Sequence, residues 1–64
     1  MQKSAKELKH GDVLKLFWGA ASFPTWHEVI STYDENGTVV VAVKMSYGSE
    51  TIRFDENEIV EVRD

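Results

Sequence analysis

Apolar and polar residues alternate along most of this chain, which is the pattern of strands that bury one face. The alternation predicts five strands, over residues 12–18, 26–33, 38–45, 50–54 and 59–62. Leu14 and Leu16 share one face of the first strand, and Lys15 lies on the other. The segment 38–45 is rich in valine, which favours a central strand.

Turn-forming residues separate these strands. Asn36-Gly37 between two β-rich runs predicts a tight hairpin, because both central residues of that turn need positive φ. Residues 19–24 predict a loop, residues 47–49 another turn, and the polar segment 55–58 a short 3₁₀ turn.

The N-terminal segment predicts a short helical turn over residues 4–10. Ser4 can cap its first N–H groups, and Glu7, three residues later, can reach back. Gly11 is expected to end it, because glycine tolerates positive φ. Leu8 is expected to cover the bottom of the core.

These elements predict an all-β domain spanning residues 1–64, a five-stranded SH3-like barrel with an N-terminal helical turn and a 3₁₀ turn before the last strand. An OB-type barrel is the nearest alternative, but it usually needs more residues and a helix. The predicted core consists of Leu14, Leu16, Ile30, Val41, Val43, Ile52 and Val62. A one-residue change of register would exchange Ile30 for Val29, and Val41 for Val40 or Ala42.

Composition restricts how so small a chain is stabilised and what it binds. It has 64 residues, no cysteine and a net charge of −4. The two histidines lack a second pair of ligands at zinc spacing, so we expect no metal, no cofactor and stability from apolar burial alone. The acidic balance disfavours non-specific nucleic-acid binding, and no apolar run is long enough to span a membrane. A cytoplasmic location is therefore expected.

Aromatic residues are expected to gather at one end of the barrel. In an antiparallel meander, the end of the first strand, the start of the second and the end of the third share one rim. That rim collects Trp18, Phe23, Pro24, Trp26, Met45 and Tyr47. The candidate ligand-binding residues are Trp18, Phe23, Trp26, Lys44 and Tyr47. Such rings can hold a peptide, a cation or a stacked base, or they can simply cap a thin core.

The positions of these residues resemble Tudor domains of the SH3-like superfamily. The likeness lies in Gly11-Asp12, Trp18, Trp26, Tyr47-Gly48-Ser49 and Ile59, and covers about 50 residues. It implies that Trp18, Trp26 and Tyr47 are walls of a cage for methylated lysine or arginine. Lys44 stands where the family usually has a fourth aromatic wall, and its charge would repel a cationic ligand. The resemblance therefore supports the fold more than a methyl-ligand function.

No arrangement of residues indicates catalysis. Cysteine is absent, no serine lies in a nucleophile elbow, and the adjacent residues His27 and Glu28 point to opposite faces of a strand. We therefore expect no catalytic residues and a small interaction module that binds a peptide or protein through the aromatic rim. The alternatives are a nucleic-acid-associated barrel, in which Lys15, Lys44 and Arg53 flank stacked bases, and an accessory domain whose aromatics form a homodimer. A monomer or weak dimer is expected.

Overall fold

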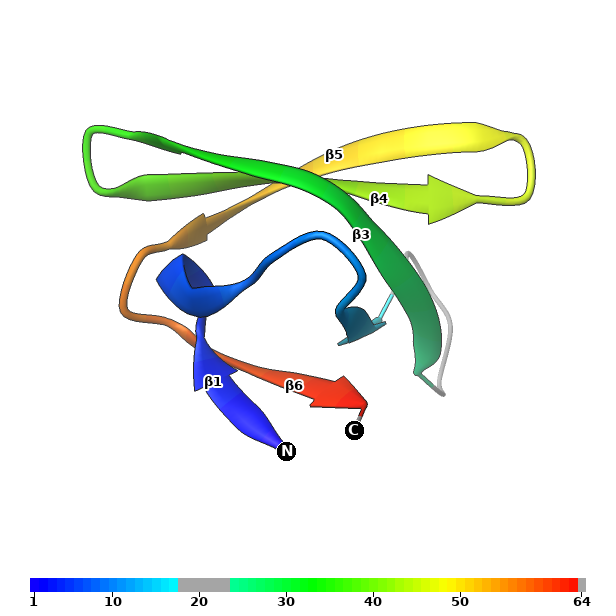
Figure 1. The fold of residues 1–64 in the computed structure, drawn as a ribbon, viewed down its shortest axis with the longest axis horizontal. Coiled ribbons are helices and arrows are strands. Elements are labelled where there is room, and N and C mark those ends of the chain that lie inside the picture. Colours follow the sequence, from blue (N-terminus) through cyan, green and yellow to red (C-terminus); the bar gives the residue numbers. More distant parts are fainter. Residues whose placement is uncertain (18–23, 64) are drawn as a thin grey trace.

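The computed structural model describes residues 1–17 and 24–63. Its elements are β1 (Gln2–Ser4), the 3₁₀ helix η1 (Ala5–Glu7), β2 (Val13–Leu16), β3 (Thr25–Glu35), β4 (Thr38–Met45), β5 (Gly48–Asp55) and β6 (Ile59–Arg63). All strand pairs are antiparallel, and the order across the sheet is β1-β6-β2-β3-β4-β5 (Figure 1). The all-β prediction is confirmed.

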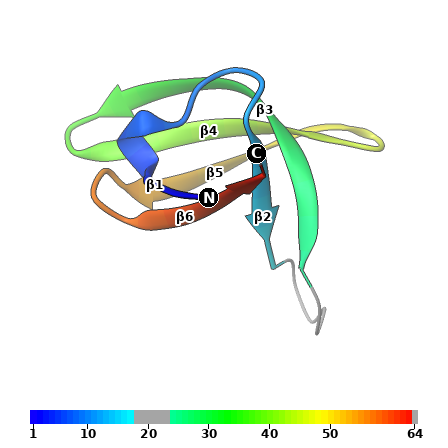
Figure 2. The ribbon, with the colours of Figure 1, turned by 60° about the horizontal axis from the view of Figure 1, so that its bottom comes forward.

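The sheet has two halves that share β3. The first part of β3, Thr25 to Glu28, pairs with β2, and the part from Val29 onward pairs with β4. A β-bulge between Val29 and Ser31 marks the change. Bulges bend a strand and increase its twist. In both ribbon views β3 accordingly curves from the β4–β5 half to the half that contains β2 and β6 (Figures 1 and 2).

The core lies between the two halves and is built mainly from valines. Its buried members are Ala5, Leu8, Leu14, Val29, Val39, Val41, Val43, Val60 and Val62. Leu16, Met45, Ile52 and Phe54 are partly buried against them. Leu14, Val41, Val43 and Val62 were predicted for the core and are fully or almost fully buried. Leu16 and Ile52 were also predicted there, and they lie at its margin.

The prediction that Ile30 is a core residue is wrong. Its side chain is 40% exposed, whereas Val29 is 0% exposed. The reason is the bulge, because the extra residue shifts the alternation of side chains at the point where β3 changes partner. The N–H of Val29 donates to the carbonyl of Asp12 at 2.7 Å, and its carbonyl accepts the N–H of Gly11 at 3.0 Å. These bonds extend the β2–β3 contact up to the bulge and leave Ile30 on the outer face.

Two local predictions at turns are confirmed. Asn36 and Gly37 have φ angles of 51° and 86°, as the two-residue hairpin turn requires. Ser4 and Glu7 form the capping box of η1, since the carboxylate of Glu7 accepts bonds from the N–H and the hydroxyl of Ser4, both at 2.9 Å. The 3₁₀ helix is shorter than the predicted turn and ends before Gly11, which lies in the following turn with a φ of 96°.

Two further details differ from the prediction. The described chain has six strands rather than five, because the polar residues of β1 pair with β6 through backbone groups that the side-chain pattern does not reveal. With β1 and β5 at its two edges, the described sheet is open. The expected 3₁₀ turn over residues 55–58 is a β-turn, in which the N–H of Glu58 donates to the carbonyl of Asp55 at 3.0 Å.

Candidate functional site

Trp26 lies on the outer face of the sheet, away from the core. It pairs with Lys15 across β2 and β3, and the next pair, Leu14 with His27, faces the opposite side. Leu14 is fully buried in the core, so Trp26 and Lys15 share the outer face. The indole is nevertheless only partly exposed. Side chains on the outer surface must therefore cover part of it.

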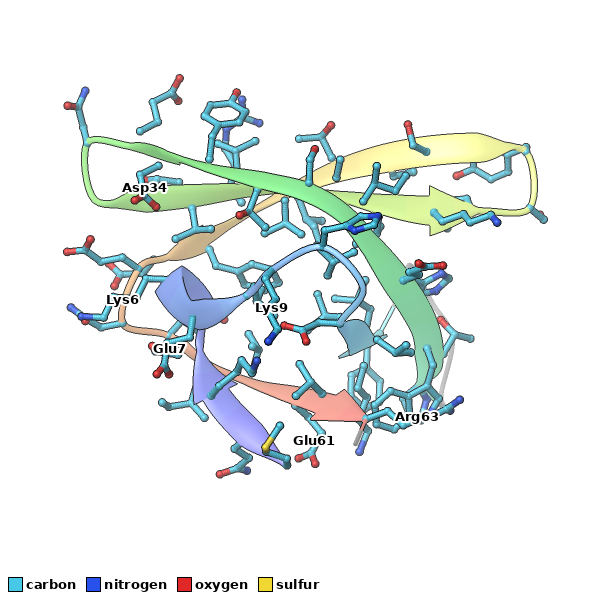
Figure 3. All side chains as sticks on the ribbon, in the orientation of Figure 1. Lys6, Glu7, Lys9, Asp34, Glu61 and Arg63 are labelled. Carbon is cyan, nitrogen blue, oxygen red and sulfur yellow. The ribbon has the colours of Figure 1, made fainter. Side chains whose placement is uncertain are left out.

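Arg63 covers this ring. The central carbon of its guanidinium lies 4.5 Å from the centroid of the Trp26 ring, a cation–π contact. Arg63 pairs with Val13 on β2, which places its side chain on the same outer face. Figure 3 shows Arg63 beside the first part of β3. Four residues, Val13, Lys15, Trp26 and Arg63, define what we call the Trp26 face.

The Trp26 face carries two cations close to the indole. Glu28 lies on the same side of the sheet as Arg63, across β2 from it, with Val13 between them. The carboxylate of Glu61, also on the outer side of β6, forms an ion pair with the N-terminal ammonium group at 3.3 Å. Among the described residues, neither Lys15 nor Arg63 forms an ion pair. In the described part of the chain, the face therefore combines an aromatic ring with two cations that form no ion pair.

His27 lies on the inner side and links strands that are not paired at this point. Its Nε2 is 2.7 Å from the hydroxyl oxygen of Thr25, and its Nδ1 is 3.3 Å from the carbonyl oxygen of Lys44. A carbonyl only accepts, so the Nδ1–H donates to it. The imidazole thereby ties the start of β3 to the end of β4, next to the Trp26 face on the other side of the strand.

Tyr47 and Lys44 lie at the turn between β4 and β5. Tyr47 is 70% exposed, and its hydroxyl donates to the carboxylate of Glu50 at 2.8 Å. That bond favours the neutral phenol and raises the pKa of Tyr47; partial desolvation and the charge of Glu50 act in the same direction. Lys44 is exposed on the outer face of β4, opposite Ser49. Figures 2 and 3 show this turn apart from the end of β6 that carries Arg63.

The predicted rim is therefore described only in part. Trp18 and Phe23 lie outside the described residues, so the prediction that their rings meet Trp26 stays a prediction. Of the described candidates, Trp26 contacts Arg63, whereas Tyr47 contacts its neighbour Glu50. Trp26 is partly exposed, and Tyr47 is largely exposed.

Sequence reasoning missed Arg63. Val60 and Val62 are apolar and alternate with polar residues along the last strand, so the pattern does place Arg63 on the outer side of that strand. The register of that strand against β2, which brings it over Trp26, depends on pairing between the two ends of the chain. No local pattern encodes that pairing.

The described residues enclose no pocket and contain no group of three or more side chains that could ligate a metal ion. None of the helical segments in the described chain has the length and apolar character to cross a membrane. Searches against known protein families, curated proteins and solved structures found no match to this chain.

Proposed function

We propose that this chain is a small non-catalytic interaction module that binds a peptide, or a loop of a protein partner, with Trp26 as its main anchor. One observation carries the proposal: a tryptophan lies on the outer face of the sheet, outside the core cluster, with an arginine stacked on it. Tryptophan and arginine are enriched among the residues that dominate binding energy at protein interfaces.

The core does not need the Trp26 ring. The buried cluster is complete with alanine, leucine and valine side chains, and Trp26 packs on the other side of the strand. The lack of an enclosed pocket in the described part favours an extended partner over a small ligand.

The arrangement of strands also supports the SH3-like assignment. β2 to β5 form a meander, and β6 returns to pair with β2, so the order β6-β2-β3-β4-β5 is the one expected for that fold. β1 is then an addition at one edge. A Tudor-like origin remains a proposal that rests on the sequence resemblance alone.

A nucleic-acid-associated barrel is the second candidate. Lys15 and Arg63 beside Trp26 would suit a stacked base with a neighbouring phosphate. The net charge of −4 weighs against this candidate, because binding of a polyanion depends on clustered positive charge.

The proposal can be tested with a random dodecapeptide library displayed on phage and selected against the wild-type protein. Selected peptides are synthesised, and their affinities are compared for wild type, Trp26→Ala and Tyr33→Ala. Tyr33 is a matched control because it is an aromatic residue on the outer part of the same strand and is 55% exposed. Trp26→Ala should weaken binding by about tenfold or more, and Tyr33→Ala should leave it nearly unchanged.

Folding is checked by circular dichroism melts of each variant. Trp26→Leu is a second variant, because it keeps an apolar side chain at this position but removes the aromatic face. Equal affinity of wild type and Trp26→Leu would contradict the proposal, as would a library that yields no peptide whose binding depends on Trp26.

A further inference from the structure

We propose that the partner segment bound by the Trp26 face is acidic, with a carboxylate that docks between Lys15 and Arg63 beside an apolar side chain on Trp26. This inference rests on the proposed function and specifies its ligand. It depends on the charges around the indole and on the conformation of Arg63.

Two cations flank one ring. Lys15 lies directly opposite Trp26 in the β2–β3 register, and the guanidinium of Arg63 is stacked 4.5 Å from the ring centroid. Among the described residues, neither has a carboxylate partner. An unpaired cation beside a hydrophobic ring attracts a ligand that offers a negative charge together with an apolar group.

The position of Arg63 over Trp26 favours carboxylate binding. Contact with the ring takes up no N–H donor of the guanidinium, whose planar fork can donate two parallel bonds to a carboxylate. Contact with Trp26 also restricts the side chain before a ligand arrives. Less conformational entropy is then lost when the bond forms.

The local charge differs in sign from that of the whole chain. Among the described residues, Lys15 and Arg63 of this face outnumber the neighbouring Glu28, since Glu61 is in contact with the N-terminal ammonium group. The chain as a whole carries −4. A short acidic segment can contact the positive face alone, whereas a nucleic-acid strand would extend its phosphates over the acidic remainder. These charges favour an acidic protein segment over nucleic acid.

The test starts from the phage-selected dodecapeptides whose binding is lost in Trp26→Ala. Their sequences should be enriched in Asp and Glu relative to the unselected library. The double variant Lys15→Gln/Arg63→Gln should bind them about tenfold or more weakly than wild type. The matched control is Lys6→Gln/Lys9→Gln, which removes the same charge from exposed residues in and just after η1, apart from Arg63 (Figure 3), and should change affinity less than about twofold.

Each outcome distinguishes the two proposals. This inference would be overturned if the Trp26-dependent peptides were not enriched in Asp and Glu, or if they lost equal affinity in the two double variants. Either result would leave the proposed function intact. The absence of any Trp26-dependent peptide would overturn both. A single-stranded oligothymidine that binds through Trp26, with affinity falling steeply as salt rises, would replace the acidic peptide by nucleic acid.

Discussion

Two adjacent residues on β3 should lose very different amounts of stability on substitution by threonine. Val29 is 0% exposed, and Ile30, at the bulge, is 40% exposed. Threonine suits a strand at either position, so strand propensity changes little. At Val29 the new hydroxyl would enter an apolar core, which costs roughly 1–3 kcal/mol in proteins.

At Ile30 the hydroxyl would remain in contact with water. The substitution removes the terminal methyl group and replaces one methylene by the hydroxyl, in a side chain that is already 40% exposed, so the cost should be about 1 kcal/mol or less. A chain of 64 residues has only roughly 3–10 kcal/mol of stability, so the effect at Val29 is a large fraction of the total.

Urea unfolding followed by circular dichroism measures both variants. Val29→Thr should lower the midpoint by about 1 M or more, and Ile30→Thr by clearly less. A larger loss for Ile30→Thr, or equal losses, would show that the bulge does not lie where the structure has it and that Ile30 faces the core.

Three further predictions concern the turns. Gly37→Val places a β-branched residue at a φ of 86°, where a Cβ would meet nothing within 4 Å. Backbone strain alone should therefore lower the free energy of unfolding by about 1–3 kcal/mol, measured in a thermal melt. An unchanged melting temperature would contradict the turn. Hydrogen bonds from Ser4 lower the pKa of Glu7 below its usual value of 4.5. Wild type should therefore be more stable than Glu7→Gln above pH 4.5, and this difference in stability should shrink as the pH falls through the lowered pKa. A difference that does not change with pH would refute the capping box. Glu50→Gln should lower the pKa of Tyr47 toward 10.0 in an ultraviolet titration, and an unmoved pKa would show that the two side chains do not interact.

Local sequence patterns were sufficient for much of the fold. The alternation of apolar residues predicted the positions of the five longer strands because each buries one face. Asn36-Gly37 and the pair Ser4 and Glu7 identified a hairpin turn and a helix start, since each satisfies a conformational or hydrogen-bonding need within four residues.

Features that depend on distant pairing were not predictable in this way. The bulge at Ile30 arises because β3 changes partner there, and β1 exists because its backbone pairs with the other end of the chain. The candidate site has the same origin. Trp26 was identifiable as an aromatic residue at a strand start, but its contact with Arg63 depends on the register between β2 and β6.

The central claim is that a partner binds on the Trp26 face. The most direct test is a ¹⁵N-edited nuclear magnetic resonance titration of the wild-type protein with the tightest phage-selected dodecapeptide. The largest shifts should occur at the indole N–H of Trp26 and at the amides of Val13, Lys15 and Arg63. Shifts concentrated around Tyr47 at the β4–β5 turn, with the Trp26 indole unmoved, would contradict the account.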